Sequence, residues 1–367
     1  MAVQVRRILL LITDLEIGGT PTVVRELATR LNLMPHVKCE VASLSQLGPV
    51  GQQLRGKGIQ VHALGGRGIS NAFSVMTQLI DLVRFGRFDT VLSFLIHANA
   101  MAGAASLFFK RGHVRWLQSI QTTQPSPHWH WRLQRRAHKR AERISVPSPS
   151  VSRVANQLAG IPLNKFVVIP NGVNPDEFKI DRVRTGGSQV GFIGRLDPIK
   201  RIPDLLHATK ILGNSIDLHI FGAGREREHI QAEIRRMGID GRVTLHGAVP
   251  RPQDALKQID LLVLPSSAEG FGLVLIEAMA AGVPVIGTNA PGISDVVKNN
   301  ETGLLVPVGS PPELAEAIRR VMEDSALRHR LIARAQEDVR ERFTWNAVIR
   351  QYAALLEIES IEPPVVG

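Results

Sequence analysis

Short apolar runs alternate with amphipathic stretches along most of the chain. Helical patterns such as Pro21–Leu31 and Phe73–Phe85 separate these runs. This alternation is typical of a parallel sheet that is built from βα units. The expected strands of the first half are Ile8–Ile12, Val37–Ser43, Ile59–Ala63, Thr90–Phe94, Val114–Leu117, Ile144–Val146 and Val167–Ile169.

A turn-rich segment from Ile169 to Pro175 interrupts this order, and the alternation then starts again. The second set of expected strands is Val190–Ile193, Asp217–Phe221, Val243–Leu245, Leu261–Leu264, Pro284–Gly287 and Gly303–Val306. From Pro311 the pattern is helical, and the Phe343–Trp345 step indicates the end of one helix and the start of another. The sequence therefore predicts an α/β protein of two doubly wound domains, 1–175 and 176–344. Ligands of such domains bind at the carboxyl ends of the strands, here facing a central cleft.

The amino-acid composition excludes several classes of protein. With 44% hydrophobic residues in 367, the chain is neither mostly disordered nor fibrous. The only cysteine, Cys39, excludes a disulfide-stapled secreted protein and favours the cytoplasm. Residues 1–180 carry 22 Lys and Arg against 9 Asp and Glu, so most of the net charge of +11 lies there. This half is expected to attract an anionic partner, such as membrane headgroups.

The charge-free stretch from Val91 to Phe109 is interrupted by polar residues, so we interpret it as a strand leading through a loop into a helix. His97 follows the strand Thr90–Phe94 and is expected to point into the cleft. A histidine there either binds a sugar hydroxyl or moves a proton, or it packs without a functional role.

The segment Leu264–Ala280 is the richest in candidate chemistry. A strand ends at Pro265, and a loop with Gly270, Phe271 and Gly272 leads into a helix. Free backbone N–H groups at such a helix start form a positive nest for a pyrophosphate. Glu269 in the loop and Glu277 in the helix are candidates to bind sugar hydroxyls and a ribose diol. The alternative is that Glu269 only complements the helix dipole and Glu277 faces water.

Two further loops are candidates to bind phosphate. Arg195 and Lys200 follow the strand Val190–Ile193 and suit a diphosphate, unless they are merely solvated surface charges. Gly18 and Gly19 follow the first strand, with Pro21 expected at the first helical position. This loop either lends N–H groups to the same phosphate or is only a turn.

The basic segment 129–143 places Trp129, Leu133, Ala137 and Ala141 at helical spacing. A basic amphipathic helix with tryptophan suits an anionic membrane surface, although the apolar stripe would equally pack on the domain. Neither an Asp-x-Asp pair nor a metal-spaced Cys/His set is present in the sequence. We therefore expect no metal and no cofactor. A nucleic-acid-binding motif is also absent, so no nucleic-acid partner is expected.

An ordered set of motifs resembles glycosyltransferase family 4, the retaining GT-B enzymes of the glycosyl transferases group 1. The matching pieces are Gly18-Gly19, Pro170–Val173 with Phe178, Gly194-Arg195 with Lys200, Phe221–Gly224, Pro265-Ser266 with Glu269, Glu277–Met279, Gly282–Val285, Thr302–Val306 and Arg342–Trp345. Many members also carry a histidine after the strand that corresponds to Val114–Leu117, and here that region has none. His97 is the candidate to do part of its work.

The resemblance implies two Rossmann-like domains, with the acceptor on the first and a nucleotide-sugar on the second. It implies that Arg195 and Lys200 hold the diphosphate, Glu269 the donor sugar and Glu277 the ribose, helped by backbone N–H groups of 270–272. The last helix, about 345–360, would return to the first domain.

The activity that the resemblance implies is retaining, metal-independent transfer of a sugar, from a UDP-sugar rather than a GDP-sugar, to a glycan or lipid-linked acceptor. Cell-surface polysaccharide, lipopolysaccharide or glycolipid synthesis at the inner face of the membrane fits the basic first half. The alternatives are an inactive sugar- or lipid-binding relative and a nucleotide-sugar epimerase or phosphorylase of the same fold.

Overall fold

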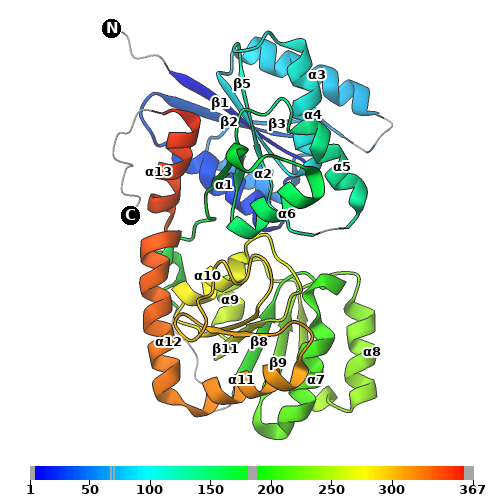
Figure 1. Cartoon of the computed structure of the whole chain (residues 1–367), viewed down its shortest axis with the longest axis vertical. Coiled ribbons are helices and arrows are strands. Elements are labelled where there is room, and N and C mark those ends of the chain that lie inside the picture. Colours follow the sequence, from blue (N-terminus) through cyan, green and yellow to red (C-terminus); the bar gives the residue numbers. More distant parts are fainter. Residues whose placement is uncertain (1–4, 67, 69–70, 125, 181–187, 359–367) are drawn as a thin grey trace. The chain divides into compact units, whose positions relative to one another are not determined.

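The computed structural model describes residues 5–66, 68, 71–124, 126–180 and 188–358. The chain forms two compact units (Figure 1). The first comprises Met1–Asn171 and Asn346–Gly367, and the second comprises Gly172–Trp345. The sequence placed the two boundaries after residues 175 and 344. Residues 359 and 360 of the expected last helix lie outside the described residues.

The first unit is a doubly wound α/β domain. Its described residues form a seven-stranded parallel sheet in the order β3-β2-β1-β4-β5-β6-β7, so the order reverses between β1 and β4. The strands are β1 (Arg6–Ile12), β2 (Val37–Ser43), β3 (Val61–Ala63), β4 (Thr90–Phe94), β5 (Arg115–Ser119), β6 (Ile144–Val146) and β7 (Phe166–Val168). The helices are α1 (Gly19–Leu31), α2 (Gly48–Gly56), α3 (Ala72–Gly86), α4 (Ile96–Ala105), α5 (His128–Ala137), α6 (Pro149–Ala159) and α13 (Trp345–Leu356), whose residues from Asn346 onward belong to this unit.

The second unit repeats this architecture. Its described residues form a six-stranded parallel sheet in the order β10-β9-β8-β11-β12-β13, which reverses between β8 and β11. The strands are β8 (Gln189–Ile193), β9 (Asp217–Phe221), β10 (Val243–Gly247), β11 (Leu261–Leu264), β12 (Val285–Thr288) and β13 (Leu304–Val306). The helices are α7 (Ile202–Leu212), α8 (Arg227–Met237), α9 (Pro252–Leu256), α10 (Leu273–Ala280), α11 (Pro311–Glu323) and α12 (Ser325–Asp338). Both units are thus Rossmann-like, as the sequence predicts.

The apolar runs form strands because helices cover both faces of each sheet. Ile8–Ile12 in β1 and Leu261–Leu264 in β11 are buried at every position, which is why these strands have continuous apolar sequences. Every expected strand is present, with shifts of one or two residues at its ends. The helical step near Phe343 is also confirmed, because α12 ends in a π-turn and α13 starts at Trp345.

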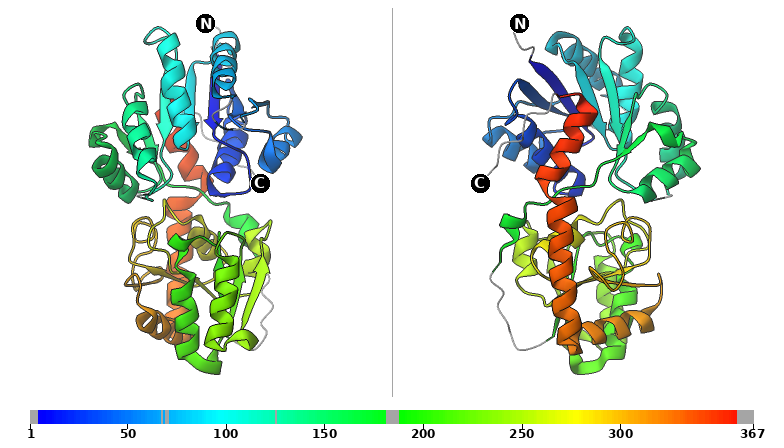
Figure 2. Two further views of the ribbon diagram at one scale, coloured as in Figure 1. Left: turned by 90° about the vertical axis from the view of Figure 1, so that its right-hand side faces the viewer. Right: turned by 60° about the vertical axis from the view of Figure 1, so that its left-hand side comes forward.

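Helix α13 is anchored within the first unit (Figure 2). Its only tyrosine, Tyr352, is fully buried, and this burial raises the pKa of the phenol to about 12. Just after the helix, the Glu357 carboxylate pairs with Arg115 at 3.0 Å. None of the described helices is both long and apolar enough to cross a bilayer.

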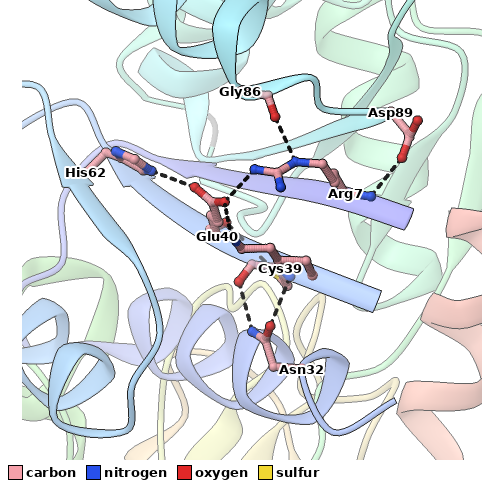
Figure 3. A network of polar contacts seen from close by, with 8 residues as sticks. Arg7, Asn32, Cys39, Glu40, His62, Gly86 and Asp89 are labelled. Atoms are coloured by element: carbon pink, nitrogen blue, oxygen red, sulfur yellow. Dashed lines mark hydrogen bonds and ion pairs between the residues drawn. The ribbon is translucent and has the colours of Figure 1, made fainter. Parts of the chain in front are cut away.

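A buried carboxylate links neighbouring strands of the first sheet (Figure 3). Glu40 in β2 is 3% exposed and contacts Arg7 at 2.9 Å, His62 at 2.8 Å and Lys38 at 3.5 Å. The Arg7 guanidinium also donates to the Gly86 carbonyl oxygen at 2.7 Å. Because these residues come from three neighbouring strands and the end of α3, the network ties those elements together.

Candidate functional site

Two loops of the second unit meet where the strand order of its sheet reverses. One loop follows β8 and carries Arg195 and Lys200, and the other follows β11 and carries Glu269. Strands β8 and β11 are direct neighbours in the sheet, so the loops at their carboxyl ends lie side by side. In open α/β sheets this reversal point is where ligands bind.

Lys200 and Glu269 form the centre of this site. The Lys200 ammonium donates to Glu269 Oε1 at 2.5 Å, and both side chains are only 14% exposed. The Ser266 hydroxyl donates to the same carboxylate oxygen at 2.7 Å. The structure therefore joins two residues that are 69 positions apart in the sequence.

Backbone contacts fix the two loops against each other. Ser267 N–H donates to the Ile199 carbonyl oxygen at 2.9 Å, and Glu269 N–H donates to the Pro291 carbonyl oxygen at 2.9 Å. Gly292 has φ +84°, and a Cβ there would lie 2.1 Å from the Glu269 carbonyl oxygen. Only glycine fits both the left-handed backbone and this close approach. The position of Glu269 thus depends on the loop after β12 as well as on its own.

Arg195 lies at the same edge of the sheet but has a different partner. Its guanidinium is 71% exposed and contacts the Asp197 carboxylate at 3.2 Å. The next residue, Leu196, donates its backbone N–H to the Ala223 carbonyl oxygen at 2.9 Å, so the loop after β9 supports the loop after β8. Gly222 makes this approach feasible, since a Cβ there would meet the Gly194 carbonyl oxygen at 1.8 Å.

Helix α10 begins directly after the Glu269 loop. Gly272 has φ +80° and precedes the first helical residue, Leu273. The Phe271 side chain is 4% exposed and packs edge-on against Phe343 at 5.5 Å, which anchors the loop in the core. Gly270 and Glu277 are partly exposed, and Glu277 lies in the second turn of α10. The roles expected for the backbone N–H groups of 270–272 and for the Glu277 carboxylate stay predictions.

The candidate residues of the first unit lie at the carboxyl edge of its own sheet. Gly18 precedes α1 and its carbonyl oxygen accepts from Thr22 N–H at 3.1 Å. The expectation that Pro21 is the first helical residue is wrong, because α1 begins at Gly19. Proline is tolerated there since N–H groups in the first turn have no intrahelical partner.

His97 lies in the first turn of α4, where only Leu95 separates the helix from β4, so the expected loop is almost absent. Its exposed ring contacts Trp129 and His130 of α5, with centroid distances of 5.6 and 5.7 Å. Burial, followed by the charge of His97, lowers the pKa of His130 below its ordinary value.

The apolar stripe expected for 129–143 is confirmed only in part, since Ala137 and Ala141 are buried and Leu133 is partly buried, whereas Trp129 is exposed. Helix α5 ends at Ala137, and the side chains it buries are Trp131, Gln134 and Ala137. Trp129 is 50% exposed. A spacing of four residues groups Trp129 with the apolar stripe, whereas the tertiary packing of α5 buries Trp131 in its place.

The sequence does not predict the contacts of two residues at these sites. Ser266 belongs to a family motif, but its hydrogen bond to Glu269 follows from the fold of the loop. His130 gave no signal beyond its place in a basic segment. Among the described residues there is no group of three or more His, Cys, Asp or Glu side chains placed to hold a metal ion.

Two family models match consecutive parts of the chain. The model described as Glycosyltransferase Family 4 matches residues 17–177. The model described as Glycosyl transferases group 1 matches residues 173–338, which include Arg195, Lys200 and Glu269. Together the two matches extend over most of the 367 residues.

Curated relatives match over part of their length. The uncharacterized glycosyltransferase MJ1607 of Methanocaldococcus jannaschii is 31% identical over 234 residues, which are 59% of this chain and 60% of that protein. N-acetyl-alpha-D-glucosaminyl L-malate synthase of Bacillus anthracis is 33% identical over 165 residues, 44% of this chain and 43% of that protein. The chain thus spans about half the length of the curated relatives it matches.

A solved structure shares the fold over almost the whole chain. Anabaena HepE in complex with UDP-glucose superimposes with a TM-score of 0.85 at 20% identity, over 96% of this chain and 99% of that one. At this identity the likeness establishes the fold. The consecutive family matches and the two Rossmann-like units identify the chain as a member of glycosyltransferase family 4, with the GT-B fold.

Proposed function

We propose that the protein transfers a sugar from a nucleoside-diphosphate sugar to an acceptor hydroxyl. The observation that carries this proposal is the Lys200–Glu269–Ser266 cluster at the β8/β11 reversal point of the second sheet. It offers a cation for a diphosphate next to a carboxylate that accepts hydrogen bonds from sugar hydroxyls. The family membership supports the same reaction class.

In this proposal Lys200 and Arg195 neutralise the charge that develops on the leaving diphosphate. The bond between the anomeric carbon and the diphosphate oxygen breaks, and a new bond forms from that carbon to the acceptor oxygen. The acceptor proton passes to the departing diphosphate, and attack on the same face retains the anomeric configuration. Preorganised positive groups at a leaving group are usually the largest single contribution to such catalysis.

Two hydrogen bonds to Glu269 hold its carboxylate in place before the donor binds. Ser266 and Lys200 both donate to Glu269 Oε1, which fixes the rotamer of the carboxylate. The second carboxylate oxygen is then oriented by the same contacts toward a donor sugar. Glu277, in the second turn of α10, would accept from the ribose diol. A bidentate contact of this kind favours a ribonucleotide over a free sugar phosphate.

One comparison supports the proposed donor, and the charge of the first half supports the proposed setting. The structural relative HepE was solved with UDP-glucose, which supports a UDP-sugar rather than a GDP-sugar. The basic first half supports an acceptor in cell-surface polysaccharide, lipopolysaccharide or glycolipid synthesis, with the protein at the cytoplasmic membrane face. We propose that the reaction needs neither a metal nor another cofactor.

A panel of UDP- and GDP-sugars tests the donor by thermal shift, because a bound ligand raises the unfolding temperature. We expect a UDP-sugar to give the largest shift, and Glu277→Ala to reduce this ligand-induced shift, measured against the unliganded variant. Normal donor affinity in Glu277→Ala would contradict the ribose role. Release of nucleoside diphosphate only with acceptor present separates transfer from an epimerase or an inactive relative, and retention is read from the anomeric configuration of the product.

A further inference from the structure

Three aromatic and imidazole rings form a cluster on the first unit that the donor chemistry does not use. His97 comes from the first turn of α4, and Trp129 and His130 come from the first turn of α5. The Trp129 and His130 ring centroids lie 4.0 Å apart at an angle of 69°, and His97 contacts both rings. We call these three side chains the ring cluster. Both helices follow strands of the first sheet, so the cluster lies at the carboxyl edge of that sheet.

Trp129 differs sharply from Trp131, two residues further along the same helix. Trp131 is 5% exposed and its indole donates to the Gln124 carbonyl oxygen at 2.9 Å. Trp129 is 50% exposed, and the structure gives its indole no hydrogen bond to any described residue. The His97 and His130 rings likewise have no hydrogen bond within the described residues. Trp131 is thus part of the core, while the polar ring atoms of the ring cluster remain available to hydrogen-bond a ligand.

A buried amide network fixes the helices that carry the ring cluster. Asn99 of α4 donates to Gln134 of α5 at 3.1 Å and to the Ser119 carbonyl oxygen at 3.0 Å. Gln134 in turn donates to Gln118 of β5 at 2.8 Å. All of these side chains are at most 2% exposed. A fully connected buried network holds α4 and α5 in one arrangement, so the three rings above it are preorganised.

The turn into α4 adds a second sign of a constrained site. Leu95 has φ +71° and ψ 159°, a region that is otherwise essentially restricted to glycine. A bulky side chain in this conformation costs free energy, so the surrounding structure must hold it there. The strained residue sets where α4 begins and therefore where His97 projects.

We propose that the ring cluster is the platform for a sugar ring of the acceptor, an inference that rests on the proposed function. The face of a sugar that carries C–H groups stacks on the exposed Trp129 indole, whose π face is electron-rich. Its hydroxyls hydrogen-bond to His97 and His130. Neutral imidazole both donates and accepts a hydrogen bond, which matches a hydroxyl group. Burial, followed by the charge of His97, lowers the pKa of His130, which favours the neutral form of that ring.

An anionic bilayer is the competing occupant of this surface, and the structure of α5 favours the sugar. A helix that lies in a membrane interface buries an apolar stripe there. In α5 the stripe formed by Trp131 and Ala137 is already buried in the protein, and Leu133 is partly buried. Trp129 is thus the single largely exposed apolar side chain among the described residues of this helix. One aromatic ring flanked by imidazoles fits a carbohydrate better than a lipid phase.

The test compares Trp129→Ala with Phe85→Ala, a matched control. Phe85 is 76% exposed near the end of α3, which leads to the amino end of β4 and hence to the opposite edge of the sheet. The probes are methyl and octyl glycosides of glucose, galactose, mannose and N-acetylglucosamine, with binding measured by saturation-transfer NMR. We expect at least one glycoside to bind, Trp129→Ala to weaken it about tenfold, and Phe85→Ala to leave it unchanged. Equal affinity for the methyl and octyl forms would assign the recognition to the sugar itself.

Two results would overturn the platform. They are wild-type affinity for glycosides in Trp129→Ala and absence of any glycoside binding by the wild type. If glycoside binding is intact in Trp129→Ala and binding to phosphatidylglycerol vesicles is lost, the occupant is the bilayer. UDP titration of each variant is the parallel arm. Unchanged UDP affinity in Trp129→Ala is expected. A wild-type protein that binds glycosides but no nucleotide would refute the proposed function, and with it the acceptor role, and would leave the ring cluster as a sugar-binding site only.

Discussion

The carboxyl edges of the two sheets share a topology but differ in chemistry. In each sheet the strand order reverses once, between β1 and β4 in the first unit and between β8 and β11 in the second. At the second reversal the side chains are charged and hydrogen-bonded, with Lys200 on Glu269. At the first, the loop after β4 leads to His97 and its two ring neighbours. The fold thus decides where a ligand binds, while the loops decide which ligand it is.

Removal of Lys200 gives the largest expected effect. Lys200→Ala deletes the cation that is proposed to meet the leaving diphosphate, so kcat should fall by about 10²–10³-fold. Lys210→Ala is the matched control, since Lys210 is exposed in α7 of the same unit. Steady-state kinetics with a saturating donor measure both variants. A Lys200→Ala enzyme with the kcat of Lys210→Ala would remove Lys200 from the reaction.

Substitution of Gly292 tests whether loop geometry positions Glu269. Gly292→Ala places a Cβ 2.1 Å from the Glu269 carbonyl oxygen, so the loop must shift and kcat/KM should fall about tenfold to a hundredfold. Gly238→Ala is the control, because Gly238 also has a positive φ but nothing lies within 4 Å of its Cβ position. Both substitutions strain the backbone, and only the first should reduce turnover. Equal turnover in the two variants would show that the close approach is irrelevant to the site.

Substitution of Glu40 tests whether a change in the first unit alters stability without altering donor affinity. Glu40→Gln leaves Arg7, Lys38 and His62 without a buried counter-charge, which should lower the free energy of unfolding by about 1–3 kcal/mol. Asp81→Asn is the control, since Asp81 is exposed on α3 of the same unit and surface substitutions change stability little. Urea unfolding measures the stability and UDP titration the donor site. A fall in UDP affinity in Glu40→Gln would contradict the assignment of the donor to the second unit.

The smallest expected effect concerns two histidines at the edge of the second sheet. His219 and His246 face each other at 2.9 Å, and burial is the first cause that lowers the pKa of each. The nearby Asp217 opposes the shift at His219, while the charge of His219 adds to the shift at His246. Because the folded pKa values lie below the ordinary 6.5, the unfolded chain binds more protons just below that pH.

Stability should therefore rise with pH up to about 6.5. His246 is exposed and His219 only partly buried, so their contribution to the unfolding temperature between pH 5 and pH 7 should be at most about 2 °C. His246→Gln should flatten this dependence. His130 and His138 in the first unit also have lowered pKa values. Their contribution to the pH dependence of stability remains in His246→Gln, so the slope should decrease without vanishing. A slope that is unchanged in His246→Gln would contradict the coupling of the two rings.

The sequence predicts the architecture well because its strands are continuous apolar runs. Such runs as Ile8–Ile12 and Leu261–Leu264 are fully buried, so hydrophobic periodicity alone marks them. The strand positions also predict which side chains lie at the carboxyl ends, among them Lys200 and Glu269. The contacts of Ser266 and of the ring cluster depend on loop conformation and on which face of α5 packs inward. Local spacing does not encode that choice, because it places Trp129 on the apolar stripe whereas the packing of α5 buries Trp131.

The structure of the protein crystallised with a UDP-sugar tests the central claim most directly. The account predicts that the diphosphate oxygens lie within hydrogen-bond distance of Lys200 Nζ, that the sugar contacts Glu269, and that the nucleotide sits on the second unit. A nucleotide bound elsewhere, with the Lys200–Glu269 pair untouched by any part of it, would contradict the account.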